Sequence, residues 1–165
     1  MSNRVSAGVV LAVASTAVFT GVASAMPSDI AACGATDVDV SVAKSPEHAA
    51  GHSAFVLRYA AASDTTDCTL AGVPTDTVFF GPDGDTAPGV WTTPQPGATA
   101  TAVTITPGHA GISYLVERTD EQADPVSALA FRLPSTGADT SVRVQWPAEP
   151  VTGAELQLSP VTAEN

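Results

Sequence analysis

The chain has 165 residues with 13 Gly and 13 Pro, and its 17 acidic against six basic side chains give a formal net charge of −11. Because nucleic acids and anionic lipids are bound by clustered cations, this charge balance argues against both as partners. The abundant Gly, Pro, Thr and Val favour strands and turns over helices.

Residues 1–25 are typical of a secretory signal peptide. Arg4 gives a basic start, the stretch from Ala7 to Val22 has no charged residue, and Ala23-Ser24-Ala25 offers the small residues that precede a signal-peptidase cut. A retained membrane anchor is the alternative, but a spanning helix needs about 20 strongly apolar residues, and this run is Ala-rich and interrupted by hydroxyl residues. We therefore expect cleavage before Met26 and an exported, secreted or envelope-associated product with no membrane span.

The two cysteines, Cys33 and Cys68, are expected to form a disulfide, as pairs in exported chains commonly do. In the chain-entropy model a closed loop of roughly 36 residues contributes about 4 kcal/mol. A lipidated Cys33 is the alternative, since Ile30-Ala31-Ala32 before it loosely resembles a lipidation box. However, Pro27 to Asp29 separate that box from the apolar run, and lipidation would leave Cys68 as an odd free thiol.

Alternating apolar and polar residues predict about eight strands in the mature chain. In residues 37–42, for example, three valines alternate with polar residues, which places the valines on one face. The predicted strands are residues 37–42, 53–60, 68–73, 77–80 and 101–105, the sets Ile112/Tyr114/Val116, Leu129/Phe131/Leu133 and Val142/Val144/Trp146, and a short last strand at Leu156 and Leu158.

The segments between these strands carry turn and loop signals. Gly81 to Asp85 predicts a tight turn, Thr86 to Gly97 an uncharged loop containing Trp91, and Asp120 to Pro125 an acidic loop with at most one helical turn. A parallel sheet would need helices between its strands, and no long helical period is present. We therefore expect one all-β domain over residues 26–165, an antiparallel β-sandwich of immunoglobulin-like type, with a small closed barrel as the alternative.

Four short stretches, taken in order and with their spacing, resemble a known family. They are Cys33 after the signal, Ala49-Ala50-Gly51-His52 leading into Phe55-Val56-Leu57, Cys68-Thr69-Leu70-Ala71-Gly72-Val73-Pro74, and Val103-Thr104-Ile105-Thr106-Pro107-Gly108-His109-Ala110. Over about Cys33 to Trp146 the chain resembles a family of secreted actinobacterial domains catalogued as domain of unknown function 4232. The resemblance implies an exported or envelope-associated β-sandwich without an established activity. Members often carry a further cysteine pair in the second half, which this chain lacks after Cys68.

Two groups of side chains contain possible metal ligands, and neither predicts a site. His48 and His52 have a zinc-binding spacing only on a helix, but Ala-Ala-Gly separates them in a predicted loop, and His109 is the only other imidazole. Three aspartates, Asp76, Asp83 and Asp85, could surround calcium, but their spacing matches no EF-hand loop. We expect exposed turns at both places, with no metal and no cofactor.

The sequence carries no recognisable catalytic set: it has no Gly-x-Ser-x-Gly elbow, phosphate-binding glycine loop or dinucleotide fingerprint. The carboxylates Glu117, Asp120, Glu121 and Asp124 form a charge run, which usually marks a solvated face. We therefore expect a protein that is not an enzyme, with a hydrolase of envelope material that uses acidic residues as the alternative.

The two tryptophans have different predicted roles. Trp146 continues the inward set of Val142 and Val144, which favours packing in the core. Trp91 lies in the predicted loop and is the candidate binding residue, because aromatic side chains concentrate contact energy at interfaces; a tryptophan that covers one end of the sandwich is the alternative.

We therefore expect an exported, non-enzymatic binding or cell-envelope-associated module, whose partner is an unidentified protein or envelope component held by loops at one end. Besides the hydrolase, a structural or inhibitor-like secreted domain is an alternative, with its contacts made by the loop from Thr86 to Gly97.

Overall fold

The computed structural model describes residues 30–47, 49–119, 125–137 and 139–165. The predicted signal peptide with its cut before Met26, His48, and most of the acidic loop, residues 120–124, lie outside the described residues. The described part of the chain contains strands and no helix, and therefore no helix able to span a membrane. The strands are β1 (Val38–Lys44), β2 (His52–Ala61), β3 (Cys68–Ala71), β4 (Thr75–Phe80), β5 (Trp91–Pro94), β6 (Ala102–Ile105), β7 (Gly111–Arg118), β8 (Ala128–Arg132), β9 (Ser141–Gln145), β10 (Glu155–Leu158) and β11 (Thr162–Ala163).

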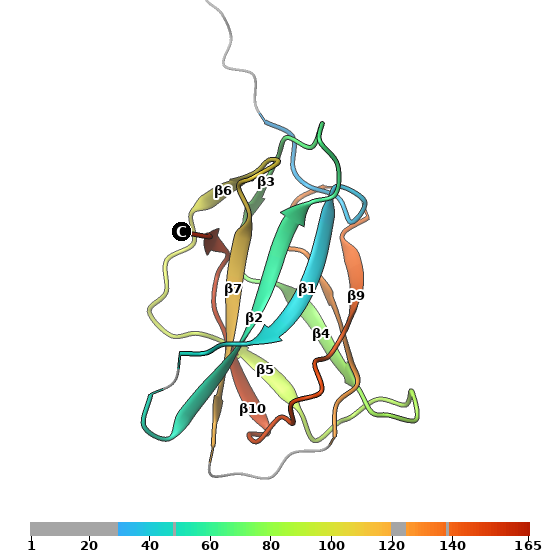
Figure 1. Cartoon of the computed structure of the whole chain (residues 1–165), viewed down its shortest axis with the longest axis vertical. Helices are drawn as coiled ribbons and strands as arrows, with labels where there is room; N and C mark the ends of the chain where they lie inside the picture. Colours follow the sequence, from blue (N-terminus) through green and yellow to red (C-terminus); the bar gives the residue numbers. More distant parts are fainter. Residues whose placement is uncertain (1–29, 48, 120–124, 138) are drawn as a thin grey trace, which may run out of the picture.

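The strands form three sheets (Figure 1). The large sheet has the order β1-β2-β7-β10-β5, and β11 pairs with β7 beside this path. The small sheet has the order β4-β8-β9, and β3 pairs with β6 in a separate two-stranded ladder. Every pairing is antiparallel except that of β5 with β10, which is parallel. The all-β prediction is therefore confirmed, and the expectation of a purely antiparallel fold is wrong at this one edge.

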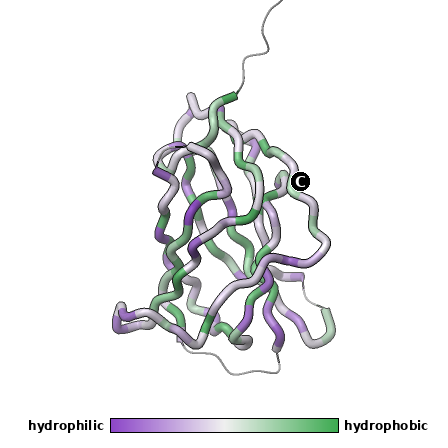
Figure 2. The backbone as a smooth tube through the Cα atoms, turned by 180° about the vertical axis from the view of Figure 1, so that it is seen from behind, coloured by the Kyte–Doolittle hydropathy of each residue, from purple (hydrophilic) through white to green (hydrophobic). Residues whose placement is uncertain are grey.

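The core lies between the large and the small sheet. Phe55 of the large sheet and Phe79 of the small sheet both pack on Trp146, with ring centroids 4.4 and 5.6 Å away. Tyr59 of β2 meets Phe131 of β8 edge to face, with centroids 6.4 Å apart. Seen from behind, hydrophobic and hydrophilic segments alternate along neighbouring strands, as expected when one face of each sheet is buried (Figure 2). Trp146 is buried, so its predicted place in the core is confirmed.

β7 buries a different set of residues from the one that its apolar pattern suggests. Ile112, Tyr114 and Val116 are only half-buried, whereas Ser113, Leu115 and Glu117 face the core. The register explains this, because Leu115 lies directly opposite the buried Phe55 of β2, and directly opposite residues point to the same face of a sheet.

Trp91 lies on a strand, so the prediction of a continuous loop from Thr86 to Gly97 is wrong in its middle. The backbone N–H of Trp91 donates to the carbonyl of Ala154, and that of Gln95 donates to Leu158, at 3.0 and 2.9 Å. Parallel pairing with β10 thus supplies hydrogen bonds to a segment that the surrounding Pro and Gly residues would otherwise disfavour as a strand. β11 was also not predicted.

The predicted disulfide is present. Cys33 and Cys68 are joined with their Cα atoms 4.9 Å apart, and both are buried. Backbone hydrogen bonds accompany the bridge: the N–H of Cys33 donates to the carbonyl of Thr69 at 3.0 Å, and the N–H of Thr69 donates to Ala31 at 2.8 Å. The bridge therefore fixes the N-terminal segment beside β3.

Candidate functional site

The outer face of the large sheet is formed by the side chains that alternate with its core residues. On this face Thr93, Gln157, Val116 and Ala54 stand directly opposite one another across β5, β10, β7 and β2. None of the four side chains is fully buried. They therefore form a continuous row across four neighbouring strands.

Trp91 lies on this outer face, two residues before Thr93 on the edge strand β5. Its side chain is 48% exposed, the highest value among the large hydrophobic residues of the described chain that are exposed. It lies directly opposite Glu155 of β10. The hydroxyl of Thr93 donates a hydrogen bond of 2.7 Å to Oε1 of Glu155, which orients this carboxylate beside the indole. The structure thus places Trp91 on a sheet face and not in a loop at one end, and its role in binding stays a prediction.

The other end of the row opens into a hollow of about 300 Å³, the outer hollow. Its apolar floor includes Ala54, Tyr114 and Val116. Glu47 of the connection between β1 and β2 and His52, the first residue of β2, contribute to its wall. Ser45, Ala49 and Ser53 complete the lining. Because Ala54 and Val116 belong to the row, the outer hollow and Trp91 lie on one surface. A concave site with an apolar floor and a few polar groups is the usual form of a ligand site.

A second hollow of about 460 Å³, the end hollow, lies on the other side of the same connection. It is lined by Lys44, Ser45, the segment from Ala49 to Ser53, Thr119 and Thr152. Three of these residues, Lys44, Ser53 and Thr152, also contact the carboxylate of Glu117. Whether a ligand in this hollow could exchange a proton with the carboxylate of Glu117 therefore depends on how that carboxylate is enclosed.

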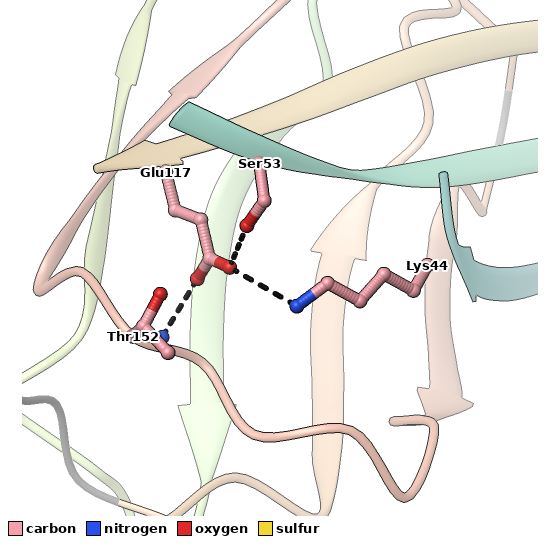
Figure 3. Close-up of polar contacts among 4 residues, drawn as sticks. All are labelled: Lys44, Ser53, Glu117 and Thr152. Carbon is pink, nitrogen blue, oxygen red and sulfur yellow. Dashed lines mark hydrogen bonds and ion pairs between the residues drawn. The ribbon is translucent and has the colours of Figure 1, made fainter. Parts of the chain in front are cut away.

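Glu117 is fully buried and has partners from three separate parts of the chain (Figure 3). Its Oε1 accepts a hydrogen bond of 2.5 Å from the hydroxyl of Ser53 and lies 3.7 Å from Nζ of Lys44. Its Oε2 accepts a hydrogen bond of 2.8 Å from the backbone N–H of Thr152. A buried carboxylate needs such partners, because burial without them costs several kcal/mol. This arrangement ties the segment around Thr152 to β1, β2 and β7.

Gly153 makes this close approach possible. A Cβ atom at this position would lie 2.7 Å from the carbonyl oxygen of Arg118, which belongs to the backbone of β7 and cannot move aside. Both carboxylate oxygens of Glu117 are engaged and out of reach of solvent, so this group acts as a structural anchor and has no open side for a substrate.

The prediction that Glu117 belongs to a solvated charge run is therefore wrong, while Asp120, Glu121 and Asp124 lie outside the described residues. One signal in the sequence could have shown its burial: Glu117 continues the alternate positions of Ser113 and Leu115, which face the core of the same strand.

The candidate metal ligands do not come together among the described residues. His52 begins β2 and lies opposite the end of β7, whereas His109 is in the turn before β7. The length of β7, eight residues or about 25 Å, therefore separates the two imidazoles. Asp76 pairs with Arg132 at 3.1 Å from the start of β4, whereas Oδ1 of Asp83 accepts the N–H of Asp85 in the turn after that strand. No group of three metal-binding side chains occurs in the part of the chain that the structure describes, and His48 lies outside it.

The fold and these surfaces define an all-β, disulfide-linked domain. Residues 33–162 match the family model described as Domain of unknown function (DUF4232), so the chain belongs to this family. The match extends beyond Trp146, where the resemblance in the sequence ends, and includes β10. No curated protein and no solved structure matches the chain.

Proposed function

We propose that the protein is an exported, non-enzymatic binding module that holds an envelope component or a protein on the outer face of the large sheet. The observation that carries this proposal is the exposed indole of Trp91, which shares that face with the outer hollow. Protein surfaces concentrate binding energy in a few aromatic residues, and an exposed tryptophan on a regular strand is already ordered before a partner arrives.

Export is supported by the signal-like residues 1–25 and by the disulfide between Cys33 and Cys68, because disulfides persist in oxidising compartments. The two sheets that face each other across one core support a β-sandwich of immunoglobulin-like type as the scaffold, with the parallel pair of β5 and β10 at one edge. In this proposal the ligand contacts the strands of the large sheet and, at the outer hollow, the connection between β1 and β2.

The two other functions are less well supported. A hydrolase that uses the acidic run around Glu117 needs a carboxylate of that run that a substrate can reach, and Glu117, the described carboxylate of the run, is enclosed by its partners. An inhibitor-like domain needs a free contact loop, and four residues in the middle of the segment from Thr86 to Gly97 are paired as β5.

The proposal is tested by crosslinking capture from a culture that exports the tagged protein, with the variant Trp91→Ala alongside. Val78→Ala is the matched control, because Val78 is 39% exposed but lies on β4 of the small sheet. We expect a partner that is lost with Trp91→Ala and kept with Val78→Ala. Capture that does not depend on Trp91, or a protein that remains free in the supernatant, would contradict the proposal.

A further inference from the structure

We infer that the ligand of the outer face is an uncharged polysaccharide chain, with one sugar ring stacked on Trp91 and its hydroxyl groups bonded to Glu155. This inference rests on the proposed function and names the class of ligand that the face is suited to hold.

The outer face pairs an indole with an oriented carboxylate. Trp91 and Glu155 stand directly opposite each other on neighbouring strands, about 4.8 Å apart. A sugar ring has one face of C–H groups, which the negative face of an aromatic ring attracts, and a rim of hydroxyl groups that donate hydrogen bonds. Glu155 offers a charged acceptor for that rim, and hydrogen bonds to charged acceptors are about twice as strong as neutral ones.

Thr93 prepares this carboxylate for a ligand. Its hydroxyl engages Oε1 of Glu155 at 2.7 Å, and Oε2 has no hydrogen-bond partner among the described residues. One oxygen is therefore held in place and the other is available to a sugar hydroxyl. A preoriented acceptor lowers the entropy cost of binding.

The length and polarity of this surface suit a polymer. The row from Thr93 through Gln157 and Val116 to Ala54 spans three strand spacings, about 14 Å, and ends in the outer hollow. Hydrogen-bonding side chains occur along it, with Thr93 and Gln157 at one end and with Glu47 and His52 in the wall of the hollow. This surface is long enough for several linked sugars, which fits a polymer better than a single monosaccharide.

Other classes of ligand fit this face less well. A protein interface has a desolvated apolar centre, yet the exposed large hydrophobic residues in the described chain, Ile30, Val78 and Trp91, lie apart on different elements. An anionic polymer would place negative charge beside Glu155, on a chain whose net charge is already −11. A ligand with an apolar ring face, many hydroxyl groups and no charge needs no large apolar patch and is not repelled by Glu155.

The experiment is native affinity electrophoresis of the exported protein in gels that contain dextran, mannan, galactan or β-glucan, with polygalacturonate as the anionic comparison. The net charge of the protein is −11, so the native protein migrates towards the anode by itself. Because an uncharged polymer in the gel does not migrate, binding to it slows the protein. The variants are Trp91→Ala, Glu155→Gln and the control Val78→Ala, and thermal melting of each shows that it is folded.

We expect retardation by at least one neutral polysaccharide, a loss of affinity of at least about tenfold with Trp91→Ala, and a smaller loss with Glu155→Gln. Val78→Ala should bind as the unchanged protein does, and polygalacturonate should retard none of them. Failure of all four neutral polymers to retard the protein, or retardation that Trp91→Ala leaves intact, would overturn the inference. If crosslinking still captures a protein partner through Trp91 while the gels show no binding, the ligand class is wrong and the binding module stands.

Discussion

Replacing Glu117 with alanine should destabilise the domain strongly, because it removes the acceptor that joins three segments. The substitution leaves the N–H of Thr152 and the hydroxyl of Ser53 without their partner, and each lost bond to a buried group costs about 1–3 kcal/mol. The contact with Lys44 adds little, because this side chain is 32% exposed and its ammonium group regains water. We expect a total loss of about 3 kcal/mol, a large share of a usual domain stability of about 5–15 kcal/mol.

The comparison of two substitutions separates hydrogen bonding from charge. Glu117→Gln keeps the shape and one acceptor oxygen, and its amide can donate to the Ser53 hydroxyl, so a loss of about 1 kcal/mol is expected. Lys44→Met should cost less than about 1 kcal/mol, since it removes only the half-exposed partner. Glu149→Ala serves as the control, because Glu149 is exposed and surface substitutions usually change stability by less than about 0.5 kcal/mol.

The assay is equilibrium unfolding in guanidinium chloride, followed by the fluorescence of the buried Trp146 in a Trp91→Phe background. At this chain length a loss of 3 kcal/mol should also lower the melting temperature by roughly 10 °C. A Glu117→Ala variant within about 0.5 kcal/mol of the parent would refute the role of Glu117 as an anchor. An equal loss for Lys44→Met would show that the charge pair, and not the hydrogen bonds, dominates.

Two further predictions concern the ends of the chain. Replacing Cys33 and Cys68 by serine should cost up to about 4 kcal/mol, the chain-entropy value for a loop of this length, and a denaturation midpoint equal to that of the parent would contradict the role of the bridge. The Nε–H of Arg58 donates a bifurcated hydrogen bond to both carboxylate oxygens of Glu164, which lowers the pKa of that carboxyl below its ordinary 4.5, so the contribution of this contact exists above pH 4.5 and is lost as pH falls through the lowered value. Both side chains are exposed, so Arg58→Gln should lower the melting temperature only slightly at pH 7, and this difference should shrink as the pH falls below 4.5; a difference that does not change with pH would contradict this reasoning.

Local alternation of side chains was enough to predict the strands that carry the core. β1 and β2 follow the predicted positions within about two residues at each end, and the buried faces of β2 and β8 contain the apolar residues that the alternation indicates. The disulfide could also be predicted, because the only two cysteines of a chain that is expected to be exported most simply pair with each other.

The candidate site could not be predicted in the same way, because its neighbours are distant in sequence. Thr93 and Glu155 are 62 residues apart, and the partners of Glu117 lie on β1, on β2 and in the segment before β10. The Pro- and Thr-rich composition around Trp91 indicates a loop when it is considered alone, and only the parallel partner β10 makes it a strand. Sequence analysis found the exposed tryptophan but not the face on which it lies.

The position of β10 between β7 and β5 has a consequence for the biogenesis of the protein. β5 has no partner in the large sheet other than β10, so Trp91 joins the outer face only after residues 155–158 have inserted. A chain that crosses a membrane unfolded, N-terminus first, would therefore assemble β1, β2 and β7 before its ligand face exists. Long-range pairing of this kind forms late and slowly, so under the proposed function a newly exported molecule would become competent to bind only when almost the whole chain has been delivered.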